Sequence, residues 1–130
     1  MYVLDTNILI YFFKGIGHVG DKLLSLSPKE ISIPSIVLFE LEVGIGKSQF
    51  PDKRIKQLED LLSVVTVLSF SSKAAKYSAG IMVQLEKKGL PIGPFDTLIA
   101  GTTLAYNAIL VTHNIKEFDR VPNLQIEDWF

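Results

Sequence analysis

The stretch Tyr2-Val3-Leu4-Asp5-Thr6-Asn7 decides the fold class of this chain. Its apolar start predicts a buried strand, and the apolar residues that follow it, 8–13, predict a helix. Asp5 therefore stands just beyond the carboxyl end of a strand, which is the edge where open α/β sheets bind ligands. Asp at such a turn also commonly caps the next helix, and Thr6 and Asn7 are good capping residues as well. This stretch alone leaves a capping and a catalytic role for Asp5 open.

Short strands alternate with helices along the rest of the chain. Strands are predicted at residues 2–4, 31–34, 64–68, 109–111 and 124–126, and helices at 8–14, 19–26, 36–47, 51–62, 73–88, 94–107 and 115–118. Such alternation is typical of a parallel sheet covered by helices on both faces, with right-handed connections. The sequence thus predicts a three-layer α/β fold, and we expect residues 1–130 to form one domain.

The composition restricts the class of protein. Hydrophobic residues make up 48% of the chain and its mean hydropathy is +0.31, so we expect a second copy or a partner to cover part of the surface. We expect no membrane span, because no apolar run approaches the roughly 20 residues required, and no secretory signal. The net charge of −1 lacks the basic footprint of proteins that bind nucleic acid by charge alone. The absence of Cys excludes disulfides and thiolate metal sites and suits the cytoplasm.

Two further acids stand on segments that we expect to be buried. Glu40 has apolar neighbours three and four residues away, and a buried carboxylate must be paired, protonated or bound to a metal. Glu42 has similar neighbours, so periodicity does not choose between the two acids. Asp96 is the third residue of a helix that begins at Pro94, where a carboxylate also suits the positive end of the helix dipole.

The segment after the fourth strand brings polar groups to the same edge of the sheet. Thr112, His113 and Asn114 follow that strand directly, as Asp5 follows the first. Asn114 and Glu117 also have capping-box spacing, which is an alternative to a role at the site. His113 is expected on a surface loop, because neither His has a partner at metal-ligand spacing.

Three carboxylates and an amide, those of Asp5, Glu40, Asp96 and Asn114, can therefore reach one sheet edge. Hard oxygen ligands without Cys or paired His suit Mg²⁺ or Mn²⁺ rather than zinc. Two carboxylates at roughly 4 Å repel by about 4 kcal/mol at an effective dielectric near 20, which a cation would offset. The pattern indicates a divalent-metal site.

Four segments in order resemble the motifs of PIN domains and, more narrowly, of VapC-type toxins from bacterial and archaeal toxin–antitoxin pairs. They are Leu4-Asp5-Thr6-Asn7, Glu40-Leu41 followed by Gly44, Pro94-Phe95-Asp96-Thr97-Leu98-Ile99-Ala100 and Thr112-His113-Asn114-Ile115-Lys116-Glu117-Phe118. The closing residues 121–129 are similar to the tail of that group, so the resemblance covers the whole chain.

The resemblance implies an endoribonuclease toxin dependent on Mg²⁺ or Mn²⁺ that cuts structured RNA, often tRNA or rRNA. It further implies a five-stranded parallel sheet in the order 3-2-1-4-5, a homodimer and a cognate antitoxin that silences the toxin. By motif match, Asp5 and Asp96 are direct metal ligands, and Glu40 completes the cluster directly or through water. The fourth family position is commonly Asp; Asn114 stands there with Glu117 nearby, so both are candidates for the fourth site residue.

Two other classes of protein are alternatives. A phosphorylatable receiver domain has a similar size and fold, but it needs a phosphoacceptor Asp after the third strand, and this chain has no acid there. A catalytically inert binding module on the PIN scaffold would have no need of Asp5, Glu40 and Asp96. Four cations are candidate contacts to an RNA backbone, or else ordinary solvated charges: Lys14, Lys47, Lys53 and Arg54.

Overall fold

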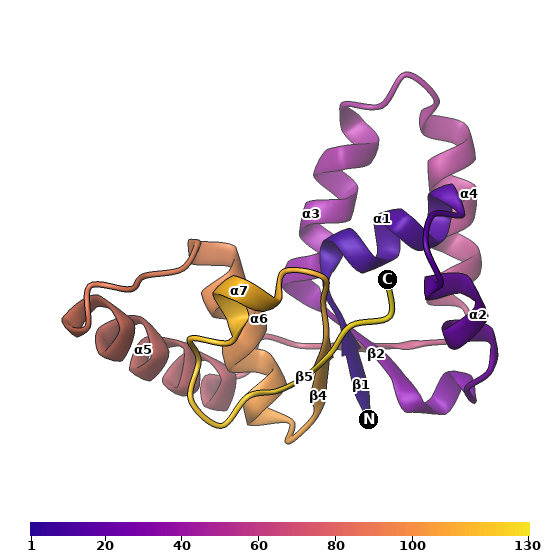
Figure 1. Ribbon diagram of the computed structural model, residues 1–130. Helices are drawn as coiled ribbons and strands as arrows, with labels where there is room; N and C mark the ends of the chain where they lie inside the picture. Colours follow the sequence, from indigo (N-terminus) through magenta and orange to yellow (C-terminus); the bar gives the residue numbers. More distant parts are fainter.

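The computed structural model describes residues 1–130, and a sheet of five parallel strands runs through it (Figure 1). The strands are β1 (Tyr2–Leu4), β2 (Ile31–Pro34), β3 (Thr66–Leu68), β4 (Ile109–Val111) and β5 (Gln125–Glu127). Their order, β3-β2-β1-β4-β5, confirms the expected 3-2-1-4-5 arrangement. The chain changes direction across the sheet between β1 and β4, where ligand sites of open α/β sheets form.

Seven α-helices and one 3-10 turn connect the strands. They are α1 (Thr6–Lys14), α2 (Val19–Leu24), η1 (Pro28–Glu30), α3 (Ser35–Gly46), α4 (Pro51–Leu62), α5 (Ser72–Lys87), α6 (Pro94–Ala105) and α7 (Ile115–Phe118). The turn η1 was not predicted, but every predicted helix and strand is present with its ends within two residues of the expected ones. None of the helices is long and apolar enough to cross a membrane.

The core explains why the sheet is covered on both faces. Successive strand residues point to opposite faces, and both Val3 and Leu4 of β1 are fully buried, as are both Leu110 and Val111 of β4. These side chains belong to one cluster of 23 buried hydrophobic residues. Helices α5 and α6 lie side by side, whereas α3 and α4 project together away from the sheet (Figure 1). The structure therefore has the three layers that the sequence predicted.

Helices α5 and α6 approach each other closely where Gly101 faces Ser78. A Cβ atom at Gly101 would lie 2.7 Å from the backbone nitrogen of Ser78, closer than real Cβ contacts. Gly101→Ala is expected to force the helices apart and to lower the free energy of unfolding by about 1–3 kcal/mol. Urea denaturation followed by circular dichroism measures this change.

Gly80 provides the matched control for that substitution. It also lies within a helix, α5, but a Cβ atom added there has nothing within 4 Å. Gly80→Ala should therefore raise the free energy of unfolding by about 0.5–1 kcal/mol, because Ala has the higher helix propensity. Unchanged stability of Gly101→Ala would contradict the close crossing.

Candidate active site

Asp5 lies in the turn between β1 and α1, and only 5% of its surface is exposed. Its Oδ1 accepts a hydrogen bond from the Thr6 backbone N–H at 2.7 Å and thereby caps α1. Its Oδ2 accepts a hydrogen bond from the Thr112 hydroxyl at 2.8 Å. Thr112 reaches Asp5 because β1 and β4 are paired neighbours, with Leu4 opposite Val111. Asp5 is thus the helix cap and also the centre of the polar edge of the sheet.

Glu40, on α3, is the acid that faces Asp5. The Thr6 hydroxyl donates a hydrogen bond to Glu40 Oε1 at 2.9 Å, so Thr6 links the two acids by its backbone on one side and its side chain on the other. Glu42 is exposed, because residues two apart on a helix point in nearly opposite directions. Tertiary packing therefore resolves the choice between Glu40 and Glu42. The sequence had indicated Thr6 only as a capping residue.

Asp96, in the first turn of α6, is half-buried beside the other acids. Burial and the negative charge of Asp5 raise the pKa of Asp96 to about 7, and a hydrogen bond with Glu117 and the charges of Glu117 and Glu40 add to the effect. Burial also raises the pKa of Asp5, although hydrogen bonds from Thr112 and Thr6 oppose this increase. Four acids from four helices or turns therefore act on one another, and we call them the carboxylate cluster: Asp5, Glu40, Asp96 and Glu117.

The two candidates for the fourth position have different surroundings. Glu117, on α7, hydrogen-bonds Asp96. Asn114 precedes α7 in the N-cap position, but its side chain makes no capping hydrogen bond, so the capping box that its spacing allowed is not formed. Its backbone N–H instead donates to the Thr112 hydroxyl at 3.0 Å. Glu117 thus joins the carboxylate cluster, whereas Asn114 supports the Thr112 hydroxyl that holds Asp5.

His113 lies on the surface, as expected for a loop residue. Its Nδ1 is 2.9 Å from Asp128 Oδ2, and its ring stacks on Phe130 with 4.2 Å between the centroids. These contacts tie the end of the chain to the loop after β4. They do not involve the carboxylate cluster.

The donor set of the carboxylate cluster fits a hard divalent cation. Every donor is an oxygen. A cation would offset both the burial of Asp5 and Asp96, which is the main reason that their pKa values are raised, and the repulsion from the neighbouring acids that adds to it. As the side chains stand, however, no three of the acids converge tightly enough to share one ion. Asp5 uses both oxygens in hydrogen bonds, and Asp96 is hydrogen-bonded to Glu117. A cation would therefore replace the hydrogen bond between Asp96 and Glu117.

Comparisons with known proteins agree with this fold. Residues 2–124 match the PIN domain family. The chain is 43% identical to Ribonuclease VapC2 of Rickettsia felis over 99% of this chain and 98% of that protein. It is 37% identical to the tRNA(fMet)-specific endonuclease VapC of Shigella flexneri over 98% of this chain and 97% of that protein.

Solved structures show the same relationship. One is the crystal structure of VapBC2 from Rickettsia felis bound to a DNA fragment from its promoter. A chain of that structure superposes on this one with a TM-score of 0.92 and 42% identity, over 99% of this chain and 98% of that one. DNA-bound VapBC from Salmonella typhimurium also gives a TM-score of 0.92, with 35% identity over 99% and 98% of the two chains. The chain described here belongs to the PIN domain family. Within that family, it is a VapC-type ribonuclease.

The alternative of a receiver domain is therefore wrong, and the structure adds a physical reason. Strand β3 ends at Leu68 on the outer edge of the sheet, and no acid follows it. The acids gather instead between β1 and β4. The position of the acidic groups, and not the α/β fold alone, separates the two classes.

Proposed function

We propose that this VapC-type endoribonuclease toxin cleaves structured RNA of the tRNA class with Mg²⁺ or Mn²⁺ bound at the carboxylate cluster. The observation that carries the proposal is the gathering of four acids at the carboxyl ends of β1 and β4, where burial together with the neighbouring acids raises the pKa of Asp96 to about 7. The similarity to a tRNA(fMet)-specific endonuclease favours tRNA as the substrate class. Three of the acids, Asp5, Asp96 and Glu40, would hold the cation, with Glu117 as the fourth site residue.

The protein contributes a preorganised set of acids to the reaction. A bound divalent cation supplies Lewis-acid chemistry, because it lowers the pKa of a water molecule and offsets charge on the phosphoryl oxygens. The Thr6 and Thr112 hydrogen bonds hold Asp5 in one orientation before RNA arrives, and Thr6 holds Glu40 as well. Asp96 keeps its proton up to about neutral pH in the metal-free protein and would release it on becoming a ligand.

We propose that the toxin acts in the cytoplasm as a homodimer until a cognate antitoxin neutralises it. The similarity to chains within VapBC assemblies supports the antitoxin partner. Large apolar side chains at the surface support a second copy, and two of them, Phe39 and Phe95, form an exposed pair with 5.6 Å between the ring centroids. Phe39 directly precedes Glu40 in the sequence, and Phe95 directly precedes Asp96.

Light scattering of the isolated protein at micromolar concentration tests the homodimer. The expected mass is twice the 14.5 kDa of one chain, because most soluble homo-oligomers are two-fold dimers. A mass of one chain at this concentration, in the absence of any partner, would contradict the proposal.

Sequencing of RNA ends after brief induction in cells tests the cleavage proposal. We expect new ends at one position, or a few positions, of a tRNA. The same induction of Asp5→Asn should produce none of them. New ends that are scattered over many transcripts, or equally abundant with Asp5→Asn, would overturn the proposal.

A further inference from the structure

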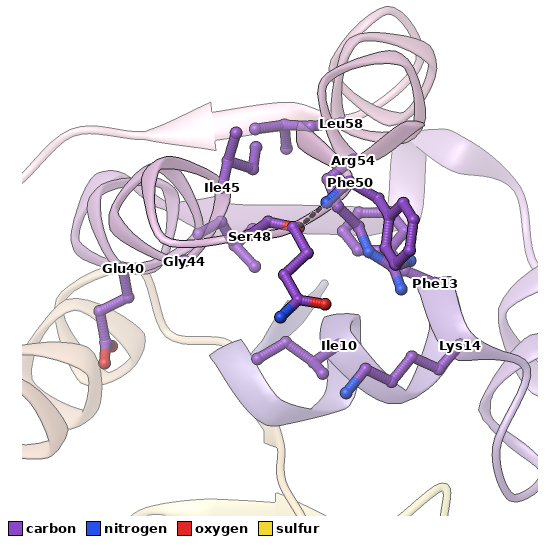
Figure 2. Close-up of a pocket in the computed structure, with 12 residues that line it drawn as sticks. Ile10, Phe13, Lys14, Glu40, Gly44, Ile45, Ser48, Phe50, Arg54 and Leu58 are labelled. Carbon is purple, nitrogen blue, oxygen red and sulfur yellow. Dashed lines mark hydrogen bonds between the residues drawn. The ribbon is translucent and has the colours of Figure 1, made fainter. Parts of the chain in front are cut away.

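A cleft of about 380 Å³ opens between α1, α3 and α4, next to the carboxylate cluster. Glu40 lies at one end of the cleft, while Phe13, Phe50 and Arg54 gather at the other (Figure 2). The walls between these ends are largely apolar and include Ile10, Leu41, Ile45 and Leu58. The cleft is therefore continuous with the site where RNA would be cut.

Two of the cations considered from the sequence, Lys14 and Arg54, line this cleft, whereas Lys47 and Lys53 do not. The ion pairs of the structure lie elsewhere, so neither Lys14 nor Arg54 has an acidic partner within 4.0 Å. The only acid that lines the cleft is Glu40, which belongs to the carboxylate cluster. The remainder of the cleft thus presents two unpaired positive charges.

Arg54 is held in place by neutral groups only. Its Nη1 donates a hydrogen bond to Gln57 Oε1 at 2.7 Å, and Gln57 Nε2 donates to the Phe13 carbonyl oxygen at 3.0 Å. The first bond lies within α4, and the second connects α4 to the end of α1. They orient the guanidinium without neutralising it, so its charge stays available to an anion.

Phe50 places an aromatic ring beside these charges. Phe50 lies in the connection between α3 and α4, and 70% of its surface is exposed. Its backbone N–H donates a hydrogen bond to Ser48 Oγ at 3.0 Å. An exposed ring of this kind next to free cations is the combination with which proteins bind unpaired nucleotides, because bases stack on the ring and phosphates pair with the cations.

We propose that this cleft binds an unpaired nucleotide adjacent to the cleaved phosphodiester of the RNA substrate. Phosphates would contact Lys14 and Arg54, and the base would pack against Phe50 and Phe13. The inference rests on the proposed RNA cleavage and deepens it, since only an unstacked base can enter the cleft. An apolar protein segment in the same place would cover the two cations without giving them a partner, and charge complementarity therefore favours RNA.

Fluorescence anisotropy with a fluorescein-labelled RNA stem–loop tests the inference. EDTA in every sample prevents cleavage, so the measurement reports binding alone. We expect Lys14→Gln and Arg54→Gln each to weaken binding and to reduce the slope of log K against log salt by about 0.7, as for one phosphate contact to single-stranded RNA. Arg54→Lys should keep most of the affinity, because it keeps the charge.

The aromatic contact is tested separately. Phe50→Ala should weaken binding of the stem–loop about fivefold or more without a change in the salt slope, whereas Phe50→Tyr should retain binding. A blunt RNA duplex should be insensitive to Phe50→Ala, since its bases stay stacked. Two exposed residues of α5, outside the cleft, provide matched controls, and Lys76→Gln and Tyr77→Ala should bind RNA as the unmodified protein does.

Three outcomes distinguish the possibilities. The inference is overturned if Arg54→Gln and Phe50→Ala bind the stem–loop as tightly as the two controls. It is also overturned if these variants keep their affinity for RNA but lose affinity for the cognate antitoxin, because the cleft would then be a protein-docking groove. Binding that depends on Phe50 in EDTA, together with no cleavage by the unmodified protein in Mn²⁺, would support the cleft and overturn the proposed cleavage.

Discussion

Replacing Asp5 by Asn is expected to reduce RNA cleavage by more than about a hundredfold and to abolish growth arrest on induction without antitoxin. Asn has the same shape and is an equally good cap, because its Oδ1 can still accept the hydrogen bond from the Thr6 backbone N–H. Its Nδ2 takes the place of Asp5 Oδ2 and can donate to the Thr112 hydroxyl, which rotates its own hydrogen away. The substitution therefore removes one negative charge from the carboxylate cluster and leaves the fold intact. Single-turnover cleavage of tRNA and growth curves after induction measure the effect.

Glu42→Gln is the matched control for Asp5→Asn. Glu42 lies on α3 two residues from Glu40, but it is exposed and takes no part in the carboxylate cluster. The Glu42→Gln variant should cleave RNA and arrest growth as the unmodified toxin does. Undiminished toxicity of a soluble Asp5→Asn protein would remove Asp5 from the mechanism.

Metal binding is expected to stabilise the fold through the carboxylate cluster. A ligand that binds only the folded state, at a hundredfold excess over its Kd, adds about 2.7 kcal/mol to the free energy of unfolding. For a chain of this size that corresponds to an increase in Tm of roughly 10 °C. The unmodified protein and Glu42→Gln should show this gain on addition of Mn²⁺ at constant ionic strength. Asp96→Asn should gain less than about 3 °C, because one ligand is missing.

The same variant should behave differently without metal. The pKa of Asp96 is about 7 in the folded protein and 3.8 in its ordinary state, so between these values the folded protein holds a proton that the unfolded chain has lost. The free energy of unfolding in EDTA therefore falls as the pH rises from about 4 to about 7. Each pKa unit corresponds to about 1.4 kcal/mol, and solvent screening of this half-exposed group reduces the total to about 1–2 kcal/mol.

The Asn side chain in Asp96→Asn is neutral at every pH in this range, so it resembles the protonated carboxyl group and does not titrate. In EDTA at neutral pH the variant should consequently melt at or above the Tm of the unmodified protein, and its own fall in Tm between pH 4 and 7 should be smaller. Thermal melts followed by circular dichroism, with and without Mn²⁺, give both results. If Asp96→Asn gains as much from Mn²⁺ as the unmodified protein, the metal is bound elsewhere.

Local sequence signals account for the close agreement between the predicted and observed elements. Apolar periodicity identified the helices, and the starts predicted for α4, α5 and α6, at residues 51, 73 and 94, lie within one residue of the observed ones. These signals depend on a few neighbouring residues only. The start of α1 differed by two residues, because Asp5 itself takes the cap position that Thr6 or Asn7 could also have filled.

The site was predictable only in part, for a related reason. Asp5 and Asp96 stand at the end of a strand and the start of a helix, so their place at the sheet edge followed from the order of the elements. Whether Glu40 or Glu42 faces the site depends on how α3 is rotated against α1. The hydrogen bond from Thr6 to Glu40 results from this rotation, and it joins residues 34 positions apart in the sequence. Apolar spacing could not supply that information.

The sequence by itself determined the class of fold, the order of the acids along the chain and the family to which the chain belongs. Only the tertiary structure decided that Glu117 reaches Asp96 while Asn114 supports Thr112, and that Lys14 and Arg54 line one cleft with Phe50. The physical reason is that apolar periodicity and helix capping depend only on residues that are close together in the sequence. Pairing of side chains across α1, α3 and α4, and across α6 and α7, depends on how packed helices are rotated and spaced around the common sheet.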